Sequence, residues 1–234
     1  MRGAGIVALL AIGIGVGSIA SAGRVAGRIS ILEKDNTPTP DLSDAVLYLE
    51  TTAPAGTGGG AAAVARPVTV EIAITDKTYA PHVVVVPLGS TVRFPNHDPF
   101  NHNVFSVSEP NSFDLGLYGR GEAKSYTFTH PGLVRVYCNV HPRMVAYVLV
   151  MENRYYAQPG NDGSFAIEDV PAGRYRLHVW HERIPSEVVK EVSPGTAGAS
   201  PELQIALNAR GYKWEPHRNK YGRNYPTNAG RERY

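Results

Sequence analysis

The chain of 234 residues has little of several features that would point directly to a function. It has one cysteine, so it forms no disulfide within itself, and 23 basic against 21 acidic residues leave a formal net charge of +2. So small an excess gives no support for binding to nucleic acid or to a membrane surface. No window of about 11 residues in the middle of the chain has a clear helical period. These absences favour a β-rich chain in which positive and negative charges nearly balance.

The N-terminus has the pattern of an export signal. Arg2 precedes an apolar stretch from Ile6 to Ala20, and small residues follow at 20–22 as a cleavage pattern for a signal peptidase. The stretch is about 15 residues long, shorter than the roughly 20 that a membrane-spanning helix needs, and no later segment is apolar enough to span. We therefore predict a cleaved signal peptide at residues 1–22, export to the periplasm or beyond, and no membrane span after cleavage.

The single cysteine opens a run of residue types that bind metals. Cys138 is followed closely by His141 and Met144, and His102 lies upstream in the segment Phe100-Asn101-His102-Asn103-Val104-Phe105. One thiolate, two imidazoles and a weak thioether are the ligands of a trigonal copper centre that transfers single electrons. In an exported protein a free thiol is a liability, which metal ligation removes. The residues therefore predict one type 1 copper ion.

Other interpretations of the same residues stay open. One thiol and two imidazoles could hold zinc with a water, although zinc makes little use of a thioether and its structural sites recruit more cysteines. A Cys138–His141 catalytic pair is too close in sequence for the spatial pairing of thiol proteases, and an inert buried thiol is a further alternative. His97 is interpreted as a loop histidine partnered by Asp98. We predict no catalytic residue and no enzymatic activity.

The middle of the chain alternates between apolar and polar residues as β-strands do. Val134, Val136 and Cys138 share one face of a predicted strand, which places the thiol inward at the end of that strand. His102 must arrive from another strand, where its neighbour Asn103 is placed to hydrogen-bond to the cysteine loop. We expect an all-β fold, with a β-sandwich that has Greek-key connections around these residues.

These segments resemble the cupredoxins, the small blue copper proteins such as plastocyanin, pseudoazurin and above all amicyanin. The resemblance covers residues 67–151 and rests on the segment 96–105 together with Cys-x-x-His-x-x-Met, whose short gap before the methionine is amicyanin-like. It implies electron transfer by one copper ion. The implied ligands are His102, Cys138, His141 and axial Met144, with Asn96 and Asn103 around them.

A second β-unit surrounds this region in the sequence. Downstream of the copper motif stand an Asp-Gly turn, a strand, Pro-x-Gly-x-Tyr and another strand, which resemble the carboxypeptidase regulatory-like, transthyretin-like sandwich. Its usual opening run, Gly-x-Val-x-Gly, stands far upstream, at residues 23–27. We therefore predict that the cupredoxin domain is inserted into a small immunoglobulin- or transthyretin-like sandwich built from 23–52 and 152–208, after a flexible linker at 53–66. A simple tandem arrangement is the alternative.

The last residues, 209–234, have few aliphatic side chains and carry seven basic against two acidic residues. This composition predicts a disordered tail. Such a tail either has no role or contacts an acidic partner. We expect a monomer that exchanges electrons with a redox donor and acceptor, a dehydrogenase or a cytochrome. The alternative functions are copper binding and delivery, and a structural surface module with an incidental metal.

Overall fold

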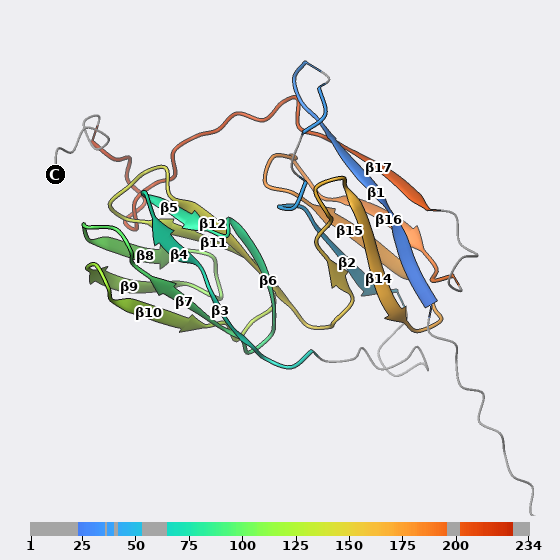
Figure 1. The fold of residues 1–234 in the computed structure, drawn as a ribbon, viewed down its shortest axis with the longest axis horizontal. Coiled ribbons are helices and arrows are strands. Elements are labelled where there is room, and N and C mark those ends of the chain that lie inside the picture. The colour runs from blue at the N-terminus through green and yellow to red at the C-terminus, as the bar shows by residue number, and fades with distance from the viewer. Residues whose placement is uncertain (1–22, 36, 40–41, 53–64, 196–201, 227–234) are drawn as a thin grey trace, which may run out of the picture.

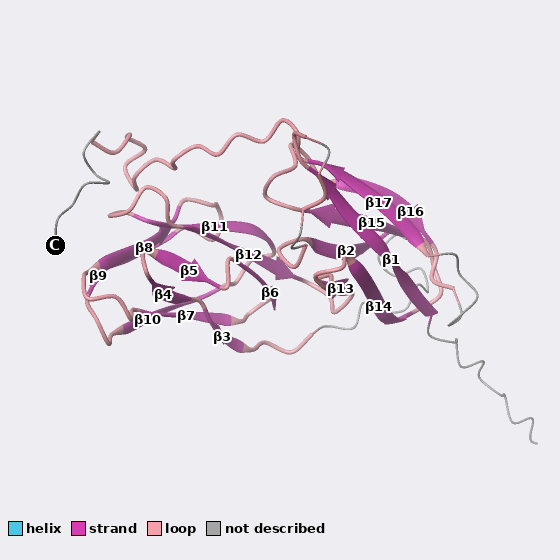
Figure 2. Ribbon diagram, turned by 45° about the horizontal axis from the view of Figure 1, so that its top comes forward, coloured by secondary structure: helices cyan, strands magenta, loops and turns pink. Residues whose placement is uncertain are grey.

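The computed structural model describes residues 23–35, 37–39, 42–52, 65–195 and 202–226. Within these residues every regular element is a β-strand, and Figure 2 shows strands and loops without helices. The predicted all-β class is therefore confirmed. No helix that could cross a membrane occurs in the described part of the chain. The predicted signal peptide, 1–22, and residues 53–64 of the predicted linker lie outside the described residues.

Ten strands from the middle of the chain form a central unit (Figure 1). They are β3 (Thr69–Glu71), β4 (Ala73–Thr75), β5 (Thr78–Ala80), β6 (Val83–Pro87), β7 (Thr91–Pro95), β8 (His102–Ser106), β9 (Phe113–Tyr118), β10 (Ala123–Thr127), β11 (Gly132–Cys138) and β12 (Val145–Met151). The chain crosses between a three-stranded sheet, β10-β7-β3, and a five-stranded sheet, β6-β12-β11-β8-β9, while β4 pairs with β5. These crossings bring β8 and β11 side by side although they are far apart in sequence.

Strands from both ends of the described chain form a flanking unit. They are β1 (Gly23–Leu32), β2 (Val46–Thr51), β13 (Tyr156–Ala157), β14 (Ser164–Val170), β15 (Tyr175–Trp180), β16 (Val188–Val192) and β17 (Leu203–Asn208). One sheet has the order β14-β1-β17 and the other β13-β2-β15-β16. The chain thus leaves this unit after β2 and rejoins it at β13, because the strands in between pair among themselves.

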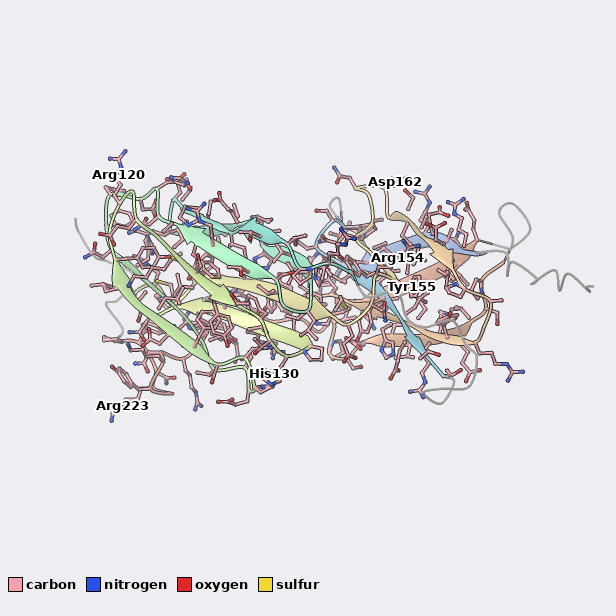
Figure 3. All side chains as sticks on the ribbon, turned by 90° about the horizontal axis from the view of Figure 1, so that it is seen from below. Arg120, His130, Arg154, Tyr155, Asp162 and Arg223 are labelled. Carbon is pink, nitrogen blue, oxygen red and sulfur yellow. The ribbon has the colours of Figure 1, made fainter. Side chains whose placement is uncertain are left out.

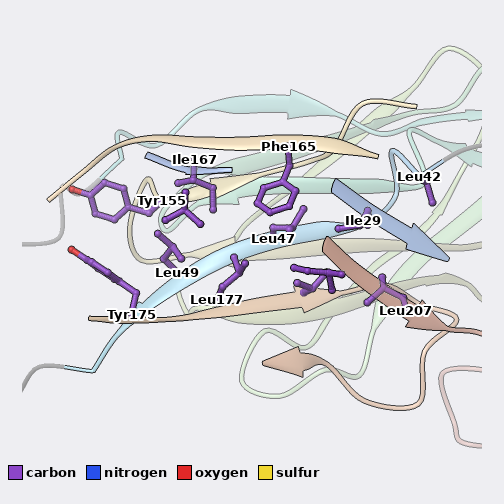
Figure 4. Close-up of a cluster of buried hydrophobic side chains, with 14 of the residues drawn as sticks. Ile29, Leu42, Leu47, Leu49, Tyr155, Phe165, Ile167, Tyr175, Leu177 and Leu207 are labelled. Atoms are coloured by element: carbon purple, nitrogen blue, oxygen red, sulfur yellow. The ribbon is translucent and has the colours of Figure 1, made fainter. Parts of the chain in front are cut away.

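An apolar core holds the two sheets of the flanking unit together. Alternation along β1 turns Ile29 and Ile31 inward, and both are buried. Figure 4 shows Ile29 with Leu47, Phe165 and Leu177, which come from four different strands and meet in one cluster. Full burial of such a side chain contributes about 1.5–3 kcal/mol, so the pairing of remote strands follows from the core they share.

A smaller apolar cluster joins the two units. Val83 and Leu149 of the central unit cluster with Val46 and Trp180 of the flanking unit, and all four are buried. The Trp180 ring lies 5.2 Å from the ring of Tyr147, measured between centroids. The two units therefore abut through β6 and β12 on one side and through β2 and β15 on the other.

Candidate metal centre

Three donor side chains of the central unit meet at one place. His102 begins β8, Cys138 ends β11, and His141 lies in the loop that leads to β12. Their ligand atoms all lie within 4.8 Å of one another, and the three residues are buried. Cys138 Sγ is 3.6 Å from His102 Nδ1 and 3.7 Å from His141 Nδ1. The fold thus brings together a sulfur and two ring nitrogens from two neighbouring strands and a loop.

These distances fit a metal ion bonded to all three donors. A metal–sulfur bond of about 2.3 Å and a metal–nitrogen bond of about 2.0 Å, at an angle between tetrahedral and trigonal, separate the two donor atoms by roughly 3.5–3.7 Å. One soft thiolate with two imidazoles suits copper, and it is also within the range of zinc ligands. The residues present therefore fit a single transition-metal ion.

The end of β11 directs the cysteine toward this point. Cys138 is buried while Arg135 is exposed, which confirms the predicted alternation. The loop that follows is closed by two contacts: Cys138 N donates to Met144 O at 3.3 Å, and Val140 N donates to Cys138 Sγ at 3.4 Å. Burial raises the pKa of the Cys138 thiol, and nearby backbone amides oppose that rise only in part. A binding cation therefore has to displace the thiol proton.

Asn103 connects β8 to the loop after β11, the two segments that carry the candidate ligands. Its carbonyl oxygen accepts a hydrogen bond from Asn139 N at 2.9 Å, so it contacts the cysteine loop through its main chain. Its side chain instead donates to Asp114 Oδ1 at 2.6 Å. The backbone N–H of Asn103 also lowers the pKa of the Cys138 thiol, against the effect of burial. The upstream strand and the cysteine loop are therefore tied together directly beside the sulfur.

Asp98 contacts the candidate ligand His102, although the sequence assigned it to the adjacent His97, whose side chain is exposed. Asp98 Oδ2 lies 2.9 Å from His102 Nε2, and both side chains are buried. Burial lowers the pKa of His102 below its ordinary value, which favours a neutral ring. Because a carboxylate only accepts hydrogen bonds, Nε2 carries the ring proton. The lone pair of Nδ1 is therefore left for the metal, facing Cys138 Sγ.

A strained turn holds the Asp98 carboxylate. Asp76 N and Lys77 N, between β4 and β5, donate to its two oxygens at 2.7 and 2.9 Å. Both residues have positive φ, 52° and 56°, a conformation that is uncommon outside glycine and costs free energy. Burial raises the pKa of Asp98, but these amides and His102 outweigh it, so the pKa lies below its usual value. Asn96 also helps to hold Asp98 in place, because its Oδ1 accepts a hydrogen bond from Asp98 N at 2.9 Å.

Met144 lies in the buried core that also contains Cys138. Its carbonyl oxygen accepts from the Cys138 amide, and its own amide donates to His141 O at 3.2 Å. These two bonds fold the loop so that Met144 lies next to both downstream donors. Its role as a weak axial ligand stays a prediction.

His141 connects the donors to the surface. It is 7% exposed, whereas His102 and Cys138 are 0% exposed. His141 opens onto a surface hollow of about 600 Å³, lined by Pro99, Phe100, Asn101, Leu117, Val140 and His141 itself. The Phe100 ring packs near both imidazoles, with centroid distances of 5.7 Å to His102 and 5.9 Å to His141. The route from the donors to solvent is therefore short and mostly apolar.

Comparison with known proteins gives likenesses in structure alone, since no protein-family model and no curated protein matches the chain. The purple cupredoxin from Nitrosopumilus maritimus matches at 26% identity and a TM-score of 0.32, over 35% of this chain and 99% of its own. A reduced Cu(I) form of an amicyanin variant matches at 27% and 0.34, over 36% and 82%. A Cu-containing nitrite reductase from Thermus scotoductus matches at 31% and 0.34, over 37% and 23%.

These neighbours are copper proteins, and each likeness covers little more than a third of this chain. The chain spans less than a quarter of the nitrite reductase, with 23% of that protein covered. The predicted likeness of the flanking unit to a carboxypeptidase regulatory-like sandwich stays a prediction.

Proposed function

We propose that this chain is a type 1 copper protein that carries single electrons. The observation that supports the proposal is the convergence of one buried thiol and two buried imidazole nitrogens within 4.8 Å of one another. A bound copper ion supplies one-electron chemistry by alternating between Cu(II) and Cu(I). In this proposal His102, Cys138 and His141 hold the ion, with Met144 as a weak fourth ligand.

The chain's own residues supply rigidity and insulation. Asp98 orients the His102 ring and leaves the lone pair of Nδ1 directed at the metal position. A carboxylate behind a histidine ligand ordinarily raises metal affinity. The closed loop after β11 fixes the sulfur, and the full burial of His102 and Cys138 keeps water away from it. This burial favours retention of the metal over delivery to another protein. We propose that electrons enter and leave through His141, at the apolar hollow.

The setting of the protein is also a proposal. The apolar N-terminal stretch and its small-residue cleavage pattern support export with removal of residues 1–22. We propose a redox protein, a dehydrogenase or a cytochrome, as donor and acceptor, with no turnover of a small substrate by this chain. We propose further that the chain is a monomer and that residues 67–151 are inserted between 23–52 and 152–208.

The test is the addition of Cu(II) to the purified metal-free protein. We expect the intense blue absorption that arises when a thiolate donates charge to Cu(II), at one copper per chain. Cys138→Ser should lack this absorption, because a serine hydroxyl cannot replace the soft thiolate that donates charge to Cu(II). His97→Gln is the matched control, since its exposed side chain lies in the same loop region and should leave the absorption unchanged.

Two outcomes would contradict the proposal: a colourless wild-type protein, or a blue Cys138→Ser variant. Repeated reduction and reoxidation separate a carrier from a delivery protein. A carrier keeps its copper through these cycles, whereas release of the ion on reduction would favour delivery.

A further inference from the structure

The C-terminal segment after β17 does not stay with the flanking unit. Figure 1 shows it, in red, crossing from β17 over to the central unit, and Figure 3 shows its Arg223 at the end of the molecule opposite Asp162 of the flanking unit. The sequence predicted a disordered tail, because aliphatic residues are scarce. Residues 209–226 nevertheless follow a defined path. The reason is that aromatic rings and hydrogen bonds anchor this segment in place of an aliphatic core.

Residues 214–225, which we call the C-terminal clamp, bond to the loop that carries the downstream donors. The hydroxyl of Tyr225 donates to the carbonyl oxygen of Cys138 at 2.8 Å. Lys220 N donates to Asn139 Oδ1 at 3.0 Å. His217 Nε2 lies 3.3 Å from the carbonyl oxygen of His141. The clamp thus contacts three residues of a single turn, two of which are candidate metal ligands.

Ring contacts add to these hydrogen bonds. The His217 imidazole stacks on Tyr137, the residue before Cys138, with centroids 4.4 Å apart and planes 23° apart. The Tyr225 ring meets His217 edge-on at 5.4 Å. The guanidinium of Arg143 lies over the Trp214 ring at 5.1 Å. Burial raises the pKa of Tyr225, so its hydroxyl keeps the proton that it donates.

The clamp owes its shape to a tight turn of its own. Asn219 Oδ1 accepts from the amides of Tyr221 and Arg223, both at 3.0 Å. Asn219 N donates to Arg223 O at 2.9 Å, and Gly222 takes a positive φ of 73°, which glycine adopts without strain. This turn reverses the chain so that Lys220 on one side and Tyr225 on the other both reach the loop.

We propose that the C-terminal clamp is a working part of the metal centre, holding the Cys138–Met144 loop in its ligand geometry and excluding water from the sulfur. The proposal rests on the proposed function for its effect on copper, but its effect on the loop stands without metal. His217, Lys220 and Tyr225 are positioning residues in this view. A loop that is held on its outer side keeps the same donor positions when the charge at the site changes.

The first experiment follows amide hydrogen exchange in the metal-free, full-length protein. Tyr225→Phe removes one hydroxyl and keeps the ring, and we expect the amides of Asn139, Val140 and Met144 to exchange about five- to tenfold faster, the effect of losing roughly one hydrogen bond. Tyr221→Phe is the matched control, because Tyr221 lies in the same segment and is 72% exposed. It should leave these rates unchanged.

Deletion of residues 213–234 is the second variant in the exchange experiment. It removes every contact of the clamp and lies outside all strands of both units, so both cores should persist. We expect faster exchange in the same loop than Tyr225→Phe causes, with unchanged rates in β1 and β15. Loop amides that exchange at the wild-type rate in both variants would overturn the proposal.

The copper-loaded protein gives the second readout. Without the clamp, water reaches the site and stabilises the more highly charged Cu(II) form, so the reduction potential should fall. We expect the equilibrium between the Cu(II) and Cu(I) forms to change by up to about tenfold, which corresponds to about 59 mV for one electron. The blue absorption should shift as well in Tyr225→Phe, and not in Tyr221→Phe. A deletion variant with the wild-type spectrum and potential, but slower reaction with a protein partner, would show that the segment serves docking instead, which also overturns the proposal.

The two proposals fail in different ways. If the wild-type protein binds no copper with blue absorption, the proposed function fails, and hydrogen exchange still decides whether the clamp holds the loop. If the wild-type protein turns blue and the clamp variants match it in every measurement, only the clamp proposal fails.

Discussion

Each unit of this protein holds a buried or half-buried histidine beside a carboxylate, but among the described residues only His102 of these two belongs to a group of three donors that could hold a metal ion. In the central unit, His102 Nε2 contacts Asp98 at 2.9 Å while its Nδ1 faces Cys138 Sγ at 3.6 Å. In the flanking unit, both nitrogens of His178 are occupied, Nδ1 by Glu187 at 3.0 Å and Nε2 by Glu50 at 3.1 Å. The residue types are similar, but the groups that face the ring nitrogens differ.

The comparison shows that ring orientation decides whether a histidine is a ligand. A carboxylate on one nitrogen fixes the ring and its tautomer, and the other nitrogen then supplies the lone pair. Carboxylates contact both ring nitrogens of His178, so neither nitrogen faces a further donor of the kind that Cys138 supplies to His102. His178 also stacks on Tyr48, with centroids 4.8 Å apart, which identifies this cluster as a hydrogen-bonded packing element of the flanking unit.

The largest expected effect on copper affinity comes from removing a histidine of the metal centre, with a histidine of the flanking unit as the control. His141→Ala should weaken copper binding by at least about a thousandfold, because a lost donor costs more than the 10- to 100-fold that follows from a lost orienting partner. His178→Ala should leave the affinity unchanged. Competition with a chelator of known affinity measures both. Equal losses in the two variants would mean that the flanking cluster takes part in metal binding.

A further histidine, His181, tests the effect of burial on a ring that is hydrogen-bonded to a backbone amide and not to a carboxylate. His181 is buried, its Nδ1 accepts from Arg183 N at 3.1 Å, and burial lowers its pKa to about 4. The unfolded chain takes up a proton near pH 6.5 and the folded chain only near pH 4, so stability is lost as the pH falls between these values. The loss should approach about 3 kcal/mol, since each unit of pKa difference corresponds to about 1.4 kcal/mol.

Chemical unfolding of the metal-free protein at several pH values between 7 and 4 measures this loss. Other groups, including Asp98, also titrate in acid, so the difference between the wild type and His181→Gln is the useful quantity. The variant should have a smaller loss of unfolding free energy over this range. Equal pH dependence in the two proteins would show that His181 becomes protonated without cost.

The smallest expected effect is a loss of copper affinity when the carboxylate beside His102 is replaced, compared with replacement of a carboxylate beside His178. Asp98→Asn keeps the shape but offers one acceptor oxygen to the two amides and the His102 ring, so the ring is held less firmly. Copper affinity should fall about 10- to 100-fold, the usual cost of losing a partner behind a ligand. Glu50→Gln, the matched change in the flanking unit, should have no effect on the affinity. An Asp98→Asn variant with wild-type affinity would remove the orienting role assigned to Asp98.

Local patterns were enough to find the donors. Alternation along β11 places Cys138 inward, and the closely spaced residues after it share a loop, so the candidate ligands could be named without coordinates. The carboxylate behind His102 was missed, because Asp98 adjoins His97 in sequence and its four-residue spacing from His102 is a weak signal. The amides that orient the Asp98 carboxylate belong to a turn 21 and 22 residues upstream. A local sequence pattern cannot predict that this turn lies next to Asp98.

The path of the C-terminal segment was also missed. Low aliphatic content predicted disorder, yet Trp214 and Tyr225 are aromatic residues of a kind that disordered segments have few of. That enrichment was the available signal. What it could not identify is the surface that these rings contact, because Tyr137 and the cysteine loop lie far away in the chain.

The amino-acid sequence by itself, through residue chemistry and strand periodicity, determined the all-β class and the three donor residues His102, Cys138 and His141. Only the tertiary structure decided which ring nitrogens face the sulfur, which carboxylate lies behind His102 and what covers the loop. The physical reason is one of range. Alternation acts between neighbouring residues, whereas a hydrogen-bond partner is chosen by whichever distant groups the folded core brings within about 3 Å.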